Sequence, residues 1–186
     1  MSLQSFLNTN SLLESQIMKL LKELQIIFNQ KWILLNTEGF NYINSLFEIF
    51  QNYSDLFEKT ENNSKTNIEF NFLNKCNDIN EKLCEIVNNY QLLIKRINEI
   101  KKILSDLNQN NSIEIINILK DNLDSLSSDF NKDFQLKQAL VKSLIFKSRL
   151  NRTDQVALIS CWIHEPNIEF TNVLKFNHLI NNFNKI

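Results

Sequence analysis

Glycine and proline are almost missing from this chain, with one of each in 186 residues. All-β folds need these residues in their turns, and nucleotide-binding α/β folds need glycine-rich phosphate loops. Long α-helices need neither residue. Because 43% of the residues are apolar and 22% are charged, the composition is that of a globular protein. The sequence therefore predicts an all-α fold.

Apolar residues recur at alternating spacings of four and three along most of the chain, as expected for helices with one buried face. Additional apolar residues at Leu73, Val87 and Ile94 widen the clearest stripe, so this helix should pack against at least two others. We expect an elongated antiparallel helical bundle with coiled-coil-like long helices. The clearest stripe consists of Phe72, Cys76, Ile79, Leu83, Ile86, Tyr90, Leu93, Ile97, Ile100, Leu104 and Leu107.

The same pattern predicts where the helices lie. We expect residues 1–10 to form a flexible tail and residues 11–186 to form a single bundle, with an S-x-x-E capping box starting the first helix at Ser11. The first stripe shifts phase near Leu34, and Gly39 sits at the shift. One helix with a local defect and two separate helices are both compatible with this shift, and we favour the first. The predicted helices span about 11–57, 68–108, 113–150, 154–164 and 169–183.

Residues 161–166, CWIHEP, look most like a chemical site, because they combine a thiol, an imidazole and a carboxylate. Cys161 and His164 lie one helical turn apart, but His178 has no paired spacing that would complete a metal site with them. A nucleophilic Cys161 would lack a glycine-rich turn and oxyanion donors. A helix end that buries Trp162 explains the stretch better. We therefore expect no catalytic residue, no metal site and no cofactor, and a protein that is not an enzyme.

Charge and hydropathy give no sign of a nucleic-acid or membrane partner. The formal net charge is −1, and no apolar run reaches the roughly 18 residues that a membrane span needs. The start of the chain lacks the features of a secretory signal. Residues 132–152 hold six basic residues and one acid, Asp133, but the lysines recur every five residues and spiral round the helix. We interpret them as a solvated face or a docking site for an acidic partner. The six are Lys132, Lys137, Lys142, Lys147, Arg149 and Arg152.

Several blocks of the sequence resemble the cyclin-dependent kinase 2-interacting protein family. In the most specific block, Trp162, Ile163 and His164 precede Pro166, as in the family's Trp-Leu-His-Gln-Pro motif. Glu165 replaces the usual glutamine, and the basic N-terminal extension of animal members is missing. The blocks are WILLNTEGFNYINSL (32–46), NEKLCEIVNNYQ (80–91), KDFQLKQALVKSL (132–144) and ISCWIHEPNIE (159–169).

The resemblance implies a non-enzymatic helical adaptor, nuclear and in part cytoplasmic, with no signal peptide or transmembrane segment. Its implied partners are a second small helical protein, a hexameric AAA+ ATPase, and cyclin-dependent kinase and checkpoint kinase complexes. The implied roles are large ribosomal subunit maturation, DNA replication and the DNA damage checkpoint. A structural coiled-coil subunit of the tethering or kinetochore type is the alternative.

We expect the partner-binding residues to come from the family motif and from the long helix. Positively charged residues beside the stripe of the long helix favour an acidic partner helix over a second copy of this chain. The predicted partner-binding residues are Trp162, Ile163, His164, Pro166, Lys75, Lys82, Arg96 and Trp32.

Overall fold

The computed structural model describes residues 3–59, 65–111, 114–146 and 152–183, and these residues contain helices and no strand. The all-α fold is therefore confirmed. A single π-helical turn joins the first two helices without a break. The elements are α1 (Leu3–Ile26), the π-helical turn (Ile27–Lys31), α2 (Trp32–Lys59), α3 (Lys65–Asn111), α4 (Glu114–Phe146), α5 (Arg152–His164) and α6 (Phe170–Phe183).

The chain divides into two compact units, where the sequence predicted a single bundle. Unit 1 comprises Met1–Ile33, Leu93–Asn131 and Ile168–Ile186, and unit 2 comprises Leu34–Leu92 and Lys132–Asn167. Each unit contains four helical segments. Unit 1 takes α1, the second half of α3, the first half of α4, and α6. Unit 2 takes α2, the first half of α3, the second half of α4, and α5.

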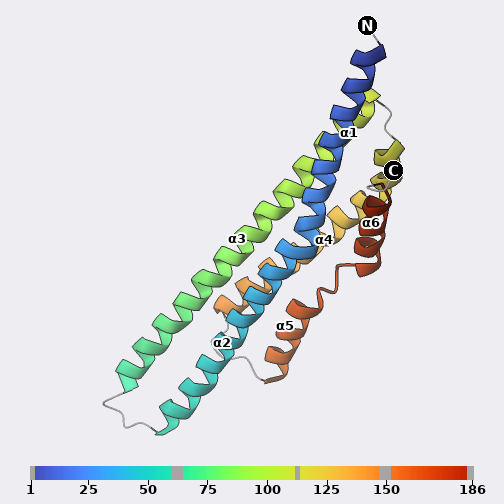
Figure 1. The fold of residues 1–186 in the computed structure, drawn as a ribbon. Helices are drawn as coiled ribbons and strands as arrows, with labels where there is room; N and C mark the ends of the chain where they lie inside the picture. The colour runs from blue at the N-terminus through green and yellow to red at the C-terminus, as the bar shows by residue number, and fades with distance from the viewer. Residues whose placement is uncertain (1–2, 60–64, 112–113, 147–151, 184–186) are drawn as a thin grey trace. The chain divides into compact units, whose positions relative to one another are not determined.

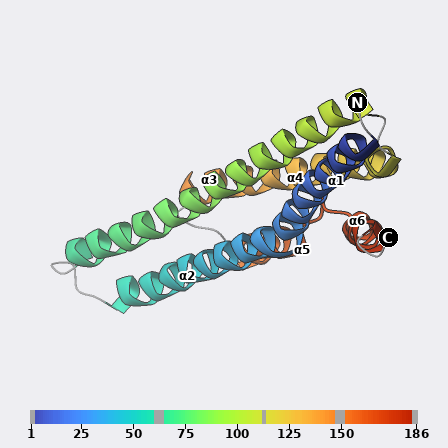
Figure 2. The same ribbon diagram turned by 45° about the horizontal axis from the view of Figure 1, so that its top comes forward.

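Within each unit, successive helical segments run in opposite directions (Figure 1). The pair α2 and α3 of unit 2 shows this most clearly, because the two helices lie side by side in both views (Figure 2). An aromatic contact joins them, since the rings of Tyr53 and Phe72 stack with their centroids 4.0 Å apart. The expected antiparallel packing of the helices is confirmed.

The helix boundaries differ from the predicted ones by a few residues, except at the start of the chain. Helix α1 begins at Leu3, so the predicted tail is helical from that residue onward and Ser11 does not cap the helix. Helix α5 begins at Arg152, with Asp154 in its first turn as expected. Leu3, Phe6 and Leu7 already have the three- and four-residue spacing of a helix, and the prediction began too late because it took the capping box at Ser11 as the start.

The first long helix does contain a local defect, but not at Gly39. The defect is the π-helical turn Ile27–Lys31, which inserts an extra residue and so rotates the following apolar stripe. Both Ile27 and Phe28 are buried there. Gly39 lies within the regular part of α2 and does not break it. The prediction of one helix with a defect was right, and its position was wrong.

The apolar stripe of α3 is buried as the sequence predicted. Leu83, Tyr90 and Ile100 have no exposed surface, and Phe72 is partly exposed at one end. Because the helices of the two units cover this stripe, it is already occupied within the chain. Any partner of α3 must therefore contact a different side of the helix. The other buried members of the stripe are Cys76, Ile86, Ile97 and Leu104.

The core of unit 1 is built on aromatic rings from the π-helical turn, α4 and α6. Phe28 packs on Phe130 and Phe176, with ring centroids 4.7 and 5.4 Å apart. Trp32 meets Phe130 edge-to-face at 4.6 Å. Edge-to-face and tilted packing of this kind stabilises aromatic cores beyond their buried area. The contact between Phe28 and Phe176 places α6 against the π-helical turn.

Candidate functional site

The CWIHEP stretch is the end of a helix, as the sequence analysis favoured. Helix α5 ends at His164, and Glu165 follows with a φ of 44°, in the left-handed region. This backbone conformation reverses the chain after a helix and usually belongs to glycine. Trp162 is fully buried, whereas Pro166 is exposed. Glu165 accepts an uncommon backbone conformation, and its side chain is buried in unit 2.

The Trp162 indole packs against α2 in unit 2 at a position where only glycine, Gly39, leaves enough space for it. A Cβ atom at Gly39 would lie 2.1 Å from Cζ2 of the Trp162 indole, which is far inside van der Waals contact. The indole Nε1–H donates a hydrogen bond to the carbonyl oxygen of Asn36 at 2.9 Å. In return, Nδ2 of Asn36 lies 3.5 Å from the carbonyl oxygen of Ile163. Two polar contacts and one close apolar contact thus attach the end of α5 to α2.

A buried ion cluster lies beside the Trp162 indole, and sequence reasoning missed it. Lys137 has no exposed surface; its Nζ lies 2.5 Å from Oδ2 of Asp133 and 3.1 Å from Oε1 of Glu165. The same Nζ lies 3.5 Å from the carbonyl oxygen of Trp162. The interpretation of Lys137 as part of a solvated face is therefore wrong. A buried lysine needs nearby carboxylates, and Asp133 four residues earlier was the available signal.

Aromatic rings enclose the ammonium group of Lys137. Its Nζ lies 5.3 Å from the ring centroid of Tyr90 and 5.4 Å from a ring centroid of Trp162. The two rings meet edge-to-face at 6.4 Å. Burial raises the pKa of Tyr90, and the carboxylates of Glu165 and Asp133 raise it further, so its phenol stays protonated.

This cluster is suited to holding α5 in place and not to catalysis. Lys137, Asp133 and Glu165 are all buried, so no substrate reaches their charged atoms. The three side chains come from α4 and from the residue after α5, and they join these segments. We name the group formed by Lys137, Asp133, Glu165, Trp162 and Gly39 the α5 anchor.

The candidate metal ligands do not come together. Among the residues that the structure describes, no three or more histidine, cysteine or acidic side chains form a group able to hold a metal ion. Cys161 is half-buried and His164 is exposed. His178 instead lies 2.9 Å from Nδ2 of Asn182 on its own helix.

The residues predicted to bind a partner fall into two groups. Trp162 and Trp32 are buried in unit 2 and unit 1, respectively, so both are core residues. Ile163, His164 and Pro166 are exposed at the end of α5. The family motif is therefore split between an anchoring tryptophan and an exposed surface, which we name the α5 end surface.

Of the cations predicted to meet an acidic partner, Arg96 already has one within unit 1. Its Nε and Nη2 lie 2.7 and 2.8 Å from the two carboxylate oxygens of Glu23 on α1. Lys82 is paired with Glu85 on its own helix at 3.2 Å, and Lys75 is exposed. Arg96 is therefore a structural residue that joins α3 to α1.

The Glu23–Arg96 pair makes a prediction about acid stability. The hydrogen bonds from Arg96 lower the pKa of Glu23 below its ordinary value. A lowered folded-state pKa stabilises a protein only while the carboxyl is ionised, so this contribution is present at neutral pH and is lost on acidification. We expect Glu23→Gln to lower the urea midpoint slightly at pH 7, and the difference from wild type to shrink as the pH falls.

Urea titrations at pH 7 and at several acidic pH values measure this difference. The control is Glu14→Gln, at an exposed position of the same helix. A difference that stays constant with pH, or that Glu14→Gln reproduces, would contradict the assignment.

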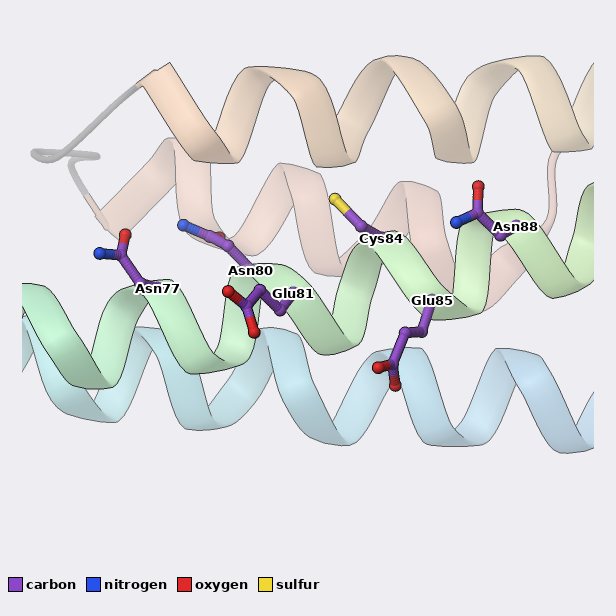
Figure 3. Close-up of a pocket in the computed structure, with 6 residues that line it drawn as sticks. All are labelled: Asn77, Asn80, Glu81, Cys84, Glu85 and Asn88. Atoms are coloured by element: carbon purple, nitrogen blue, oxygen red, sulfur yellow. The ribbon is translucent and has the colours of Figure 1, made fainter.

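A second surface feature runs along α3 in unit 2. A shallow groove there is lined by residues of this one helix, and Figure 3 shows Asn77, Asn80, Cys84 and Asn88 projecting from one side of it. Glu81 and Glu85 project from the other side. The sequence predicted Leu73 as part of the widened buried stripe, but this side chain is 50% exposed.

Several large apolar side chains remain exposed on both units. Among the described helices, none combines the length and apolar character that crossing a lipid bilayer requires. Exposed apolar groups that cluster often mark a protein interface, so these side chains are candidates for protein contacts. They include Leu34, Leu56, Phe70, Leu73, Leu92, Val156 and Ile163 in unit 2, and Leu12, Ile26, Ile33, Ile118, Phe170 and Leu174 in unit 1.

The buried anchor and the exposed surfaces are thus defined by geometry alone. Compared with known proteins, the chain matches no protein-family model, no curated protein and no solved structure.

Proposed function

We propose that the protein is a non-enzymatic helical adaptor that uses the α5 end surface to dock on a partner protein. The observation that carries this proposal is the uneven burial of the motif residues. Trp162 and Glu165 are buried, whereas Ile163, which lies between them, is 39% exposed. Binding hot spots are side chains that lose their contact with water when the partner binds, and the exposed part of Ile163 is available for such a contact.

The α5 anchor supports this role because it removes conformational freedom before binding. The end of α5 is attached through the indole of Trp162, the amide of Asn36 and the ammonium of Lys137. A surface that is ordered in advance loses less entropy when a partner binds. These buried polar groups do not strengthen a hydrophobic core by themselves. Their contacts instead hold Ile163 and His164 in one orientation.

The resemblance to the cyclin-dependent kinase 2-interacting protein family supplies the identity of the proposed partners. The adaptor pairs with a second small helical protein, and the pair docks on a hexameric AAA+ ATPase. It acts in large ribosomal subunit maturation and in DNA replication and its checkpoint, in contact with cyclin-dependent kinase and checkpoint kinase complexes. Its place of action is the nucleus. The motif that carries the resemblance also contains the exposed residues Ile163, His164 and Pro166, and this coincidence supports the proposal.

Affinity purification at native expression level, followed by mass spectrometry, tests the proposal. The test variant is Ile163→Ser with His164→Ser, which changes only exposed side chains. We expect recovery of the ATPase and of the small helical partner to fall by about tenfold or more, as for a hot-spot residue. The control is Leu174→Ser, at an exposed apolar position of α6 in unit 1.

Three outcomes would count against this proposal. Recovery of neither an ATPase nor a small helical protein with the wild-type chain would remove the adaptor role. Recovery of tethering or kinetochore proteins in their place would favour the structural coiled-coil subunit. Equal losses in the test and control variants would show that the α5 end surface is not the docking site.

A further inference from the structure

The π-helical turn Ile27–Lys31 departs from the α-helical hydrogen-bond pattern in the middle of a long helix. The backbone N–H of Trp32 donates to the carbonyl oxygen of Ile27, five residues earlier. In an α-helix the same N–H would donate to Phe28, four residues earlier. Because π-helical turns are rare compared with α-helix, contacts from outside the helix have to favour this one.

A cluster of amides joins α6 to this turn. Nδ2 of Asn29 donates a hydrogen bond to Oδ1 of Asn177 at 2.9 Å, and Nδ2 of Asn177 donates to Oδ1 of Asn29 at 3.0 Å. Nε2 of Gln25, four residues before Asn29, donates to the same oxygen of Asn177 at 3.2 Å. A reciprocal amide pair admits one alignment of two helices, because both donors and both acceptors must match. Asn177 therefore fixes how α6 sits against the turn.

Aromatic rings join the same segments. Phe176, the residue before Asn177, packs edge-to-face on Phe28 with ring centroids 5.4 Å apart. Phe28 and Trp32 both contact the ring of Phe130 on α4, at 4.7 and 4.6 Å. All four aromatic residues are at most 3% exposed. Two neighbouring residues of α6 thus contact two neighbouring residues of the turn, one pair through rings and the other through amides.

Helix α6 depends on this docking for its own helical structure. It has 14 residues, and isolated helices of about this length are marginally stable in water. Its buried apolar residues are Val173, Phe176 and Ile180, whereas Phe170 and Leu174 remain exposed. The amides that hold it are only half-buried. A segment with few buried side chains and partly exposed hydrogen bonds opens at a lower free energy than the whole protein does.

We propose that α6 is a strap that holds the turn Ile27–Lys31 in its π-helical form through Phe176 and Asn177. When α6 detaches, the N–H of Trp32 pairs with the carbonyl oxygen of Phe28 and the turn becomes α-helical. This change rotates Trp32 relative to α1 by about one residue, roughly 100°. The inference goes beyond the adaptor function, because it needs neither the α5 end surface nor a partner.

The alternative is that α4 alone holds the turn through Phe130 and that α6 only covers it. Apolar contact between rings is non-directional and tolerates a range of orientations. The hydrogen bonds between Asn29 and Asn177 are directional, so they select one alignment more strongly. The two explanations differ in what happens to the turn when α6 is detached.

NMR spectroscopy of the full chain detects the register of the turn directly. A scalar coupling across the hydrogen bond links the Trp32 nitrogen to the accepting carbonyl carbon, which belongs to Ile27 in the π-helical form and to Phe28 in the α-helical form. The test variant is Phe176→Ser with Asn177→Ala, which removes both contacts of α6 with the turn. We expect the coupling partner to change from Ile27 to Phe28. We also expect the amides of α6 to exchange with solvent at least about tenfold faster.

Asn177→Ala alone is a milder variant, and Asn181→Ala, at an exposed asparagine of the same helix, is its matched control. By relaxation dispersion, we expect Trp32 and the residues of α6 to share one exchange rate and one minor-state population in Asn177→Ala. That population should be about tenfold larger than in Asn181→Ala, because the docked state has lost its amide hydrogen bonds. The amides of Leu20 and Leu21 in α1 should show no such exchange.

The proposal is overturned if Trp32 still couples to Ile27 after the α6 amides have lost their protection, since α4 would then hold the turn alone. Different exchange rates for Trp32 and α6, or equal populations in Asn177→Ala and Asn181→Ala, also overturn it. If the double variant unfolds unit 1, the single variant decides, and exchange at Leu20 and Leu21 there would show that the unit loosens as a whole and that α6 is no strap. The adaptor function fails separately, because its test depends on Ile163 and His164.

Discussion

Replacing Lys137 with alanine is expected to lower the free energy of unfolding by about 3–5 kcal/mol, the range for removing one partner of a buried ion pair. The substitution leaves the carboxylates of Asp133 and Glu165 in the core of unit 2 with no cation between them. Two like charges in a medium of low dielectric repel each other, and water cannot screen them. Urea denaturation followed by circular dichroism measures the loss.

Lys142→Ala is the matched control, because Lys142 lies on the same helix and is exposed. It should change the free energy of unfolding by no more than about 0.5 kcal/mol. A triple variant, Lys137→Met with Asp133→Asn and Glu165→Gln, removes all three charges and should recover most of the stability, since uncharged replacements of buried ion clusters are often neutral. Equal urea midpoints for Lys137→Ala and Lys142→Ala would refute the role of the cluster.

Replacing Gly39 with alanine is expected to lower the free energy of unfolding by about 1–3 kcal/mol, the usual effect of overpacking a core. In an exposed helix the same change stabilises by roughly 1 kcal/mol, because alanine is the better helix former. The sign of the change in the free energy of unfolding therefore shows whether Gly39 is closely packed or exposed. The new Cβ would lie 2.1 Å from Cζ2 of Trp162, so the indole has to move, and its hydrogen bond to Asn36 is strained or lost. Urea denaturation and tryptophan fluorescence measure both effects.

A second substitution shows whether the cost comes from the indole. Trp162→Phe leaves more room beside α2, so Gly39→Ala should cost less in that background than in the wild type, and the two changes should not be additive. Asn41→Ala, at an exposed position of α2, is the control and should be nearly neutral. A Gly39→Ala variant that is more stable than wild type would contradict the close packing of α2 and α5.

Sequence alone was sufficient for the features that depend on neighbours along the chain. The 4-3 spacing of apolar residues placed α3 and its buried side correctly, because side chains three and four residues apart share one face of a helix. The near-absence of glycine and proline excluded other fold classes for an equally local reason. The burial of Trp162 was also predicted, because a helix end explained the CWIHEP stretch better than a metal or catalytic site did.

Only the tertiary structure decided how residues far apart in the chain meet. The five-residue spacing of the lysines predicted that Lys137 is exposed to solvent. Its burial depends on Glu165, 28 residues later, as well as on Asp133. Gly39 resembled a helix defect until Trp162, from another helix, was seen to occupy its side of α2. Hydrophobic periodicity reports whether a face is covered but not by which helix, because burial is a non-directional effect. Hydrogen bonds and ion pairs have specific partners, and long-range partners are set by the fold.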